Sequence, residues 1–258
     1  MVLRTVSEIA AELTAADAAD LDRLIRRYRN DDRAGVRAAV DRARRRLKAD
    51  RAESDRLRRL MDVQNDLHTH GYHVVAGIDE VGRGALAGPV TAAAILLPPD
   101  AVITGIDDSK LLTPARREEL ARHIARVADG VSVRHIDPDV IDEIGIAAAT
   151  VQAMREALAG LGRAVDHLIV DGLPVDLPVP ARFVVNGDRH CACVAAASIV
   201  AKVSRDALMR ELDPAYRPYG FAANKGYGTP EHIAAIERYG PSTVHRRSFA
   251  PCRQQRLF

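Results

Sequence analysis

The first seventy residues follow a helical pattern of apolar and polar positions. Apolar residues recur at intervals of three and four, the period of one helix face: Leu21, Leu24, Ile25 and Tyr28, then Val36, Val40 and Leu47. Thr5 and Glu8 have the spacing of a capping box, which predicts the start of a helix there. The polar residues 30–32 interrupt the pattern. We therefore expect a unit of about three helices with an Arg-rich outer surface.

From about residue 72 the pattern changes to short apolar runs that alternate with helical segments. Strands are expected at 73–81, 89–97, 131–136, 167–170 and 182–185, the first two joined by a Gly-rich turn. Helices should begin at Thr113-Pro114, Asp137-Pro138 and Thr229-Pro230, the second running as one long helix to Gly160 or Gly162, and another should cover 192–212. Early strands followed by βαβ units predict an α/β fold, a mixed central sheet flanked by helices. We expect two domains, a helical N-terminal extension at 1–70 and a catalytic domain at 71–258.

Composition narrows the class of protein. The chain has 258 residues, of which 47% are hydrophobic, a share too high for a disordered protein. No apolar run approaches the ~20 residues that span a bilayer, and the first residues do not resemble a secretory signal. Three cysteines argue against a disulfide scaffold and for the reducing cytoplasm.

The net charge of the whole chain is only +2, although its N-terminal segment is rich in Arg. Those arginines fit either a solvated face of a helical bundle or an electrostatic contact with nucleic-acid phosphates, and the interleaved acidic residues weaken the second interpretation. Trp is absent and aromatic residues make up 4% of the chain, so a platform of many stacked rings is not expected.

Two adjacent carboxylates, Asp79 and Glu80, follow the apolar part of the run at 73–81 and precede the Gly-Arg-Gly at 82–84. Neighbouring carboxylates repel each other, and a divalent cation that prefers oxygen ligands would relieve the repulsion. Successive side chains of a strand point to opposite faces, so we expect the backbone to bend at the glycine turn if both acids serve one site. Taken alone, the motif is more simply explained as a strand-to-turn junction with solvated acids.

Two further carboxylates occupy comparable positions. Asp171 ends the run at 167–170 before a glycine, where open α/β sheets place ligand groups, although an Asx-type cap is the simpler interpretation. Asp188 precedes the predicted helix at 192–212, where capping competes with metal binding. Four carboxylates gathered at strand ends would suit two divalent ions and phosphodiester hydrolysis. Spacing along the chain cannot establish that they meet.

Two loops could contact a nucleic acid. The segment at 219–230 combines Gly, Lys and Tyr, and Tyr can stack on a sugar while Lys meets a phosphate, although its tyrosines could instead anchor the loop in the core. Residues 108–110 (Asp-Ser-Lys) could hold a phosphate or cap the following helix. Cys191 and Cys193 beside His190 lack a second ligand pair for zinc, and the serine-hydrolase and P-loop motifs are absent from the sequence.

These motifs together resemble the type 2 ribonucleases H, the family of bacterial ribonuclease HII. The matching segments run in order from about residue 74 to 251: 76–84 (AGIDEVGRG), 87–90 (AGPV), 108–112 (DSKLL), 170–172 (VDG), 187–188 (GD), 196–203 (AASIVAKV), 205–206 (RD), Tyr-Gly-Phe and Tyr-Gly-Thr within 219–229, His232, 239–241 (YGP) and 245–249 (HRRSF). The resemblance implies a ribonuclease H-like fold. It also implies an endonuclease that cuts the RNA strand of RNA–DNA hybrids and the 5′ side of a single ribonucleotide in duplex DNA, leaving 5′-phosphate and 3′-hydroxyl ends.

The resemblance also implies roles for individual residues. The metal-binding and catalytic carboxylates would be Asp79, Glu80, Asp171 and Asp188, holding two Mg²⁺ or Mn²⁺ ions. Gly82, Arg83 and Gly84 would recognise the ribose 2′-hydroxyl, Tyr227 would pack on the next sugar, and Arg83, Ser109, Lys110 and Lys202 would lie along the phosphates. A glycine-rich backbone can approach a sugar closely, and the 2′-hydroxyl is what separates RNA from DNA.

Two other functions remain open from the sequence. A junction-resolving nuclease on the same fold would not need the 2′-hydroxyl sensor, and a non-catalytic nucleic-acid-binding protein would not need clustered acids, which repel phosphate. The role of the N-terminal extension is also open, and our hypothesis is added nonspecific affinity for duplex. The last five residues, Gln254-Gln255-Arg256-Leu257-Phe258, could contact a replication clamp or simply be a frayed end.

Overall fold

The computed structural model of the chain describes residues 4–253. Contacts within the chain divide it into two compact units, with the boundary between Arg58 and Arg59. This boundary falls inside a helix that continues to Thr69, so the domain limits expected at 70 and 71 stay a prediction. None of the helices within the described range is both long and apolar enough to cross a bilayer.

The first unit is helical, as the apolar pattern predicts. Its helices are α1 (Val6–Ala15), α2 (Ala18–Tyr28) and α3 (Ala34–Thr69), the last continuing beyond the unit. The predicted capping box at Thr5 is present: its hydroxyl accepts from the Glu8 N–H at 3.2 Å, and the Glu8 carboxylate accepts from the Thr5 N–H at 2.7 Å. The predicted apolar faces of α2 and α3 are buried together with Ile9 and Leu13 of α1. Their burial explains the spacing of three and four.

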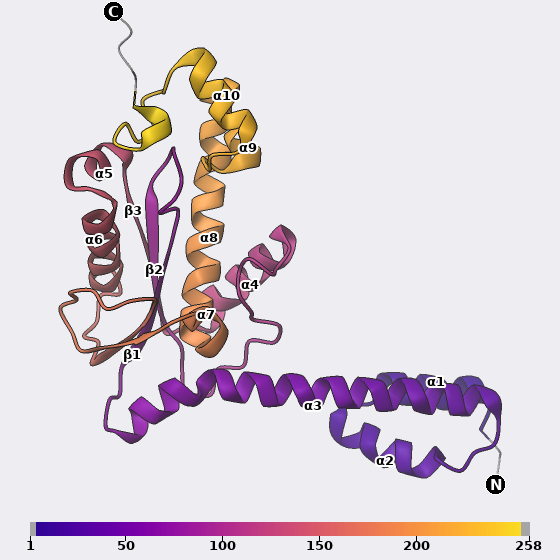
Figure 1. Ribbon diagram of the computed structural model, residues 1–258. Helices are drawn as coiled ribbons and strands as arrows, with labels where there is room; N and C mark the ends of the chain where they lie inside the picture. The colour runs from indigo at the N-terminus through magenta and orange to yellow at the C-terminus, as the bar shows by residue number, and fades with distance from the viewer. Residues whose placement is uncertain (1–3, 254–258) are drawn as a thin grey trace, which may run out of the picture. The chain divides into compact units, whose positions relative to one another are not determined.

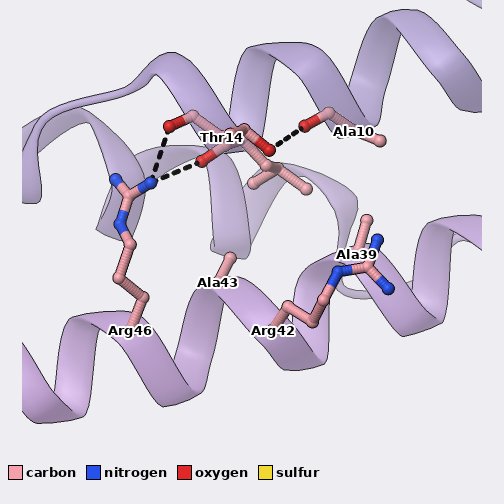
Figure 2. Close-up of a pocket in the computed structure, with 7 residues that line it drawn as sticks. Ala10, Thr14, Ala39, Arg42, Ala43 and Arg46 are labelled. Atoms are coloured by element: carbon pink, nitrogen blue, oxygen red, sulfur yellow. Dashed lines mark hydrogen bonds between the residues drawn. The ribbon is translucent and has the colours of Figure 1, made fainter.

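Arg46 of α3 is bonded inside the first unit. Figure 2 shows its guanidinium at the end of α1, where it donates to the carbonyl oxygen of Thr14 at 2.7 Å. The same guanidinium also donates to the carbonyl oxygen of Ala16. A helix leaves its last carbonyls unpaired, so this arginine caps α1 and ties it to α3. Beside it lies a small cavity of about 150 Å³ bordered by Ala10, Thr14 and Arg42. Part of the Arg-rich character of this segment is thus structural.

The second unit contains the predicted mixed sheet. Its strands are β1 (Val75–Val81), β2 (Val90–Leu96), β3 (Gly130–Ile136), β4 (His167–Asp171) and β5 (Ala181–Val184), in the order β3-β2-β1-β4-β5. The pairs β1–β2 and β2–β3 are antiparallel, whereas β1–β4 and β4–β5 are parallel. The parallel pairing brings the carboxyl ends of β1 and β4 to the same edge of the sheet.

Helices cover both faces of this sheet. Figure 1 shows α6 (Ile146–Ala159) on one face and α8 (Ala192–Leu212) on the other. The face toward α6 is an apolar core that includes Ala76 and Ile78 of β1. On the opposite face Gly77 lies against the backbone of Cys193, where a β-carbon would stand 2.3 Å from the carbonyl carbon. The missing side chain therefore lets α8 approach β1 very closely.

The remaining helices mostly begin where cap signals predict. Helix α4 (Pro114–Val127) starts after Thr113 and α10 (Pro230–Tyr239) after Thr229, and both threonines accept a hydrogen bond from the third residue of the helix. The prediction of one long helix after Asp137 is wrong. The segment forms two helices, α5 (Pro138–Ile144) and α6, because Gly145 between them has φ = 80°, outside the helical region. The shorter elements are α7 (Gly187–His190), α9 (Phe221–Asn224) and the 3₁₀ turns η1 (Asp213–Ala215), η2 (Arg217–Tyr219) and η3 (Ala250–Cys252).

Candidate active site

Three of the predicted carboxylates border one cavity at the carboxyl ends of β1 and β4. Asp79 and Glu80 come from β1 and Asp171 is the last residue of β4. The cavity has a volume of about 450 Å³ and its other lining residues are Val81, Ser109, Lys110, Ser198, Lys202 and Tyr227. The parallel strand pair and α8 thus bring together acidic, basic and aromatic residues that lie far apart in the sequence.

Asp79 and Glu80 reach the cavity from opposite faces of β1. The ladder with β2 keeps a regular register from Ala76 to Val81, so the bend that we expected between the two acids is not needed. Asp79 shares the α8 face with Gly77, and Glu80 shares the α6 face with Ile78. The cavity lies at the end of the strand, where side chains from both faces can border it.

Asp79 is the most deeply buried of these acids, with 6% of the residue exposed. Burial, together with the nearby charges of Glu80 and Asp171, raises its pKa well above the ordinary value, while a bond from Ser198 acts in the opposite direction. One carboxylate oxygen accepts from the Glu80 N–H at 2.7 Å. Within residues 4–253 no cationic side chain is bonded to this buried acid, so its charge is not fully stabilised.

Glu80 is bonded to the loop that follows its strand. Its carboxylate accepts from the Arg83 guanidinium at 3.1 Å, and 57% of the Arg83 side chain remains exposed. Burial raises the pKa of Glu80, and the charge of Arg83 partly opposes that rise. Both residues and Asp171 also border a second cavity of about 480 Å³, which is otherwise lined mainly by apolar residues of α6 and of the loop after β4. Gly82 and Gly84 flank Arg83, and the space around the Gly84 α-carbon is open.

Asp171 and Asp188 do not act as the caps that the local sequence suggests. The Asp171 carboxylate accepts from the N–H of Gly187 at 2.6 Å, which ties the end of β4 to the start of α7. Asp188 lies within α7, and the N-cap residues of α7 and α8 are Asn186 and Cys191, neither of which makes a side-chain capping bond. Burial, Asp108 and Asp171 raise the pKa of Asp188. Asp188 is near Asp171 but is not among the residues that line the cavity.

Residues 108–110 form an ordered turn at the cavity. Asp108 accepts from the Lys110 N–H at 2.9 Å and from the Arg189 guanidinium at 2.8 Å. Burial would raise the pKa of Asp108, but these two bonds hold it below the ordinary value. The Ser109 hydroxyl lies 3.0 Å from that of Ser198. The turn is therefore fixed to both α7 and α8.

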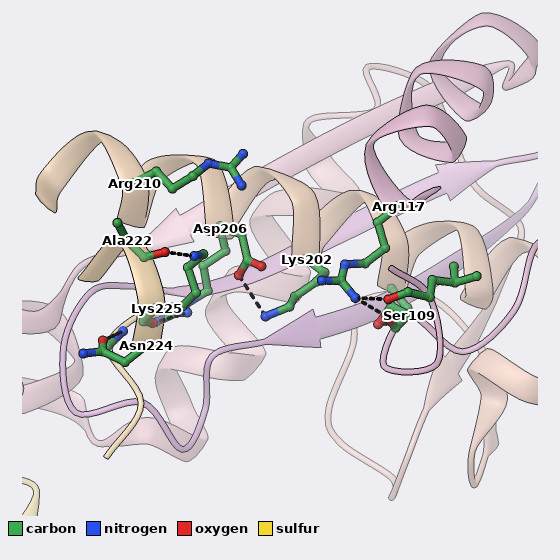
Figure 3. A network of polar contacts seen from close by, with 12 residues as sticks. Ser109, Arg117, Lys202, Asp206, Arg210, Ala222, Asn224 and Lys225 are labelled. Carbon is green, nitrogen blue, oxygen red and sulfur yellow. Dashed lines mark hydrogen bonds and ion pairs between the residues drawn. The ribbon is translucent and has the colours of Figure 1, made fainter. Parts of the chain in front are cut away.

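The basic residues of the cavity are Lys110 of this turn and Lys202 of α8, and the loop after α9 contributes Tyr227. Figure 3 shows Lys202 bonded to Asp206 at 2.8 Å and Arg117 bonded to the carbonyl oxygen of Ser109 at 2.7 Å. The Lys202 ammonium lies 5.7 Å from the centre of the Tyr227 ring. This ion pair is largely shielded from solvent, since only 20% of the Lys202 side chain and 11% of the Asp206 side chain are exposed, so Asp206 holds the Lys202 ammonium at the cavity.

The residues of the cavity suit a divalent cation. The three acids offer only oxygen donors, the kind that Mg²⁺ and Mn²⁺ prefer, and their mutual repulsion is not balanced by an equal number of bonded cations. Within residues 4–253 no group of three or more Asp, Glu, His or Cys side chains is already arranged to hold a metal ion. Cys191 and Cys193 are buried free thiols.

Several residues of the site have no local motif of their own in the sequence. Ser198 lines the cavity, Arg189 bonds Asp108, and the buried Arg205 lies 5.3 Å from the Tyr227 ring. Ser198 and Arg205 fall within family motifs, which is the one signal that could have selected them. Their contacts depend on segments far away in the chain.

Comparisons with known proteins agree with this geometry. The profile of the family described as Ribonuclease HII matches residues 76–252, and that of the Ribonuclease HII N-terminal domain matches residues 5–68. The chain is 46% identical over 250 residues to Ribonuclease HII of Geobacillus thermodenitrificans (strain NG80-2), covering 97% of this chain and 96% of the relative.

Two solved structures share the fold. Ribonuclease H2 from Pyrococcus horikoshii OT3 superposes with a TM-score of 0.63 at 28% identity, covering 70% of this chain and 96% of the other. RNase HII from Archaeoglobus fulgidus, solved in complex with PCNA, superposes with a TM-score of 0.57 at 26% identity, covering 71% of this chain and 98% of the other. The match to the family profile and the 46% identity to a relative over nearly the whole chain establish the family. The chain belongs to the ribonuclease HII family of metal-dependent endonucleases.

Proposed function

We propose that this endonuclease cuts the RNA strand of RNA–DNA hybrids and also cuts duplex DNA on the 5′ side of a single embedded ribonucleotide. One observation carries the proposal: Asp79, Glu80 and Asp171 border a single cavity that also contains Tyr227 and adjoins the Gly-Arg-Gly loop at 82–84. Acids that could hold metal ions therefore lie beside groups that could recognise a ribose.

The acids are assigned to the scissile phosphate. Asp79, Glu80 and Asp171 would hold two Mg²⁺ or Mn²⁺ ions, with Asp188 near Asp171 as the fourth acid. When bound, the two ions neutralise the charge that develops on the attacking and leaving oxygens of an in-line displacement. The Gly187 N–H fixes one Asp171 oxygen, and Ser198 fixes Asp79, so both acids are oriented by the chain itself. Cleavage would leave a 5′-phosphate and a 3′-hydroxyl.

The neighbouring groups are assigned to the strand on either side of the cut. Ser109, Lys110 and Lys202 line the same cavity as the acids and can contact phosphates, as can the exposed Arg83. The backbone of Gly82 and Gly84 would recognise the ribose 2′-hydroxyl, and the Tyr227 ring would pack on the following sugar. A binder without catalysis would gain nothing from the acids, since they repel phosphate.

The decisive experiment uses three duplexes of one sequence: duplex DNA with one ribonucleotide, an RNA–DNA hybrid, and all-DNA duplex. With Mg²⁺ or Mn²⁺ we expect cleavage of the first two, with the cut in the first on the 5′ side of the ribonucleotide. A chelator of divalent cations should abolish cleavage of both substrates. Extension of the upstream product by a DNA polymerase would identify the 3′-hydroxyl. Cleavage of the all-DNA duplex at a comparable rate would contradict the proposal and favour a junction-resolving nuclease.

A replication clamp is a further candidate partner. The Archaeoglobus fulgidus relative is solved as a complex with PCNA. The predicted clamp-binding segment of this chain, residues 254–258, lies outside the residues that the structure describes. A clamp contact through this segment therefore stays a prediction, to be tested by binding of a sliding clamp to the full chain and to a chain ending at residue 253.

A further inference from the structure

Two arginines beside the candidate active site are buried without an ionic partner. Arg205 lies on α8 and Arg246 follows α10, and both have 0% of their surface exposed. Neither forms an ion pair with a carboxylate in the described part of the chain, and burial lowers the pKa of both, that of Arg246 to about 9. A buried charge is costly unless hydrogen bonds satisfy it. The bonds that these two groups make therefore indicate what they do.

Arg205 bonds two loops at once. The first loop, residues 82–89, follows β1, and the second loop, residues 225–229, precedes α10. The guanidinium of Arg205 donates to two carbonyl oxygens of the first loop, those of Pro89 at 2.9 Å and Ala87 at 3.0 Å. It also donates to the carbonyl oxygen of Lys225 in the second loop, at 2.8 Å. A planar guanidinium with donors in fixed directions thus sets the distance between the loops.

The same guanidinium also contacts the groups assigned to sugar recognition. A β-carbon on Gly82 would stand 2.2 Å from the Arg205 Nε atom, so the Gly82 backbone packs directly against it. Gly82 has φ = 88°, a conformation that glycine adopts without strain. On the other side the guanidinium carbon lies 5.3 Å from the centre of the Tyr227 ring, within the range of a cation–π contact. One buried side chain therefore touches both proposed sugar sensors.

Arg246 holds the first loop from a different direction. Its guanidinium donates to the carbonyl oxygens of Arg83 at 2.9 Å and Gly88 at 3.0 Å, and its own N–H donates to Leu86 at 2.9 Å. The Leu86 N–H in turn donates to the carbonyl oxygen of Gly226 in the second loop at 2.7 Å. The first loop is thus bonded on several sides, with Arg83 fixed by its backbone while its side chain stays exposed.

We propose that Arg205 and Arg246 are positioning residues that fix the first loop and Tyr227 at the spacing of two consecutive sugars, and so set the preference for a ribonucleotide followed by a deoxyribonucleotide. The inference rests on the proposed function. Recognition of such a junction requires both sensors to engage at once, and the nucleic-acid backbone dictates the distance between neighbouring sugars. A misplacement on the order of 1 Å can cost up to ~10²-fold in rate.

The test replaces each arginine by lysine in the full chain. Lysine keeps the charge, but its single ammonium cannot reproduce the planar fork that bonds several carbonyls. For each variant, kcat/KM is measured on duplex DNA with one ribonucleotide and on an RNA–DNA hybrid of the same sequence. The ratio of the two values does not depend on the fraction of folded enzyme. We expect Arg205→Lys and Arg246→Lys to lower the ratio about tenfold, mainly through the single-ribonucleotide substrate.

Arg116→Lys is the matched control, because Arg116 also donates to a carbonyl oxygen, that of Thr104 at 2.7 Å, but on the first turn of α4. Its ratio should equal that of the unaltered enzyme. If circular dichroism reveals that Arg205→Lys does not fold, Arg246→Lys carries the test. An unchanged ratio in the folded lysine variants would overturn the inference.

A double variant separates positioning from general damage. If Arg205 acts through Tyr227, then Tyr227→Ala already removes the preference, and adding Arg205→Lys should change the ratio by less than about twofold. A second tenfold fall would overturn the inference. Equal kcat/KM values of the unaltered enzyme on the two substrates would also overturn the inference, but they would leave the proposed ribonuclease H activity intact. If the unaltered enzyme cuts neither substrate, the proposed function itself fails.

Discussion

At the scale of single residues, the charge of Asp171 distinguishes binding from catalysis. Asp171→Asn keeps the shape of the side chain and an oxygen that can accept from the Gly187 N–H. We expect cleavage to fall about 10³-fold, since metal-ion stabilisation of transition-state charge is worth several kcal/mol. Binding of the hybrid should be unchanged or tighter, because repulsion of phosphate decreases. Gel-shift affinity and single-turnover rate measure the two effects.

The matched control for that variant is Asp176→Asn, which changes an acid in the loop after β4 that is paired with Arg155 on the surface. It should leave both rate and affinity unaltered. Full activity of Asp171→Asn would contradict the assignment of Asp171 as a metal ligand.

A buried histidine pair should make stability depend on pH. The His232 and His245 Nε2 atoms lie 3.0 Å apart, His232 Nδ1 donates to the Tyr227 carbonyl oxygen at 2.8 Å, and His245 Nδ1 accepts from the Ser242 N–H at 3.0 Å. This chain of bonds suits two neutral rings. Burial and the neighbouring His232 lower the pKa of His245 from 6.5 to about 4.

The sign follows from proton binding. Between pH 6.5 and about 4 the unfolded chain binds a proton at His245 that the folded chain does not, so stability falls as the pH falls through this window. The pKa difference corresponds to about 3 kcal/mol at most. Urea unfolding at pH 7 and pH 5 should give a smaller difference for His245→Gln than for the unaltered chain. His70→Gln, at an exposed position, should retain the full difference. An identical pH response in His245→Gln would contradict this account.

At the scale of elements, the close contact between β1 and α8 positions the cavity. The α8 helix carries Ser198 and Lys202 to the end of β1, and the contact depends on the absence of a side chain at Gly77. Gly77→Ala should therefore destabilise the fold by about 1–3 kcal/mol, the usual cost of overpacking, and should also lower cleavage. Denaturant unfolding and activity measure the two effects.

The atoms that Gly77→Ala would meet define a sharper test. Two of the nearest belong to the Cys193 backbone, at 2.3 and 2.5 Å, and one is the Cys193 β-carbon at 2.7 Å. The double variant with Cys193→Gly removes only the last contact and should not recover stability. Recovery would mean that the side chain, not the backbone, sets the distance between β1 and α8.

Elements with local signals are the ones that the sequence predicts well. Thr5, Thr113 and Thr229 each bond the N–H three residues later, a contact that needs no tertiary structure, and each predicted helix starts there. The break at Gly145 is missed because a single glycine is compatible with a helix, and only packing determines its φ value. The strand ends are accurate to within about two residues, the usual precision of such boundaries.

The candidate site is less accessible to prediction from the sequence alone. Asp79 and Asp171 are 92 positions apart, and their proximity follows from the parallel pairing of β1 with β4, which no local pattern specifies. The resemblance to a family, not the spacing, suggested that they meet. Arg205 and Arg246 are harder still, because an arginine in a sequence gives no sign of burial, and their partners are carbonyl oxygens, which every residue possesses.

At the scale of the whole molecule, charge is unevenly distributed between the two units. Residues 1–58 contain 15 of the 37 Lys and Arg residues and 11 of the 35 Asp and Glu residues, a formal charge of +4, which leaves −2 for the rest of the chain. On α3, Arg37, Arg45 and Lys48 are exposed on one side of the helix, and no ion pair involves them in the described part of the chain. They extend over about 16 Å, the length of roughly five base pairs.

This exposed set supports the hypothesis that the N-terminal unit adds nonspecific affinity for duplex. Neutralising Arg37, Arg45 and Lys48 to Gln in the full chain should weaken binding of duplex at low salt. It should also reduce the slope of log Kd against log salt concentration by up to about 3, since each lost phosphate contact accounts for about 0.9. Arg23, Arg26 and Arg29 changed to Gln form the control of equal charge, because the first two are already paired with acids on α2.

If both triple variants weaken binding equally, net charge alone governs affinity. If neither differs from the unaltered chain at any salt concentration, the unit does not contact the duplex, and the affinity of the enzyme comes from the second unit despite its negative charge.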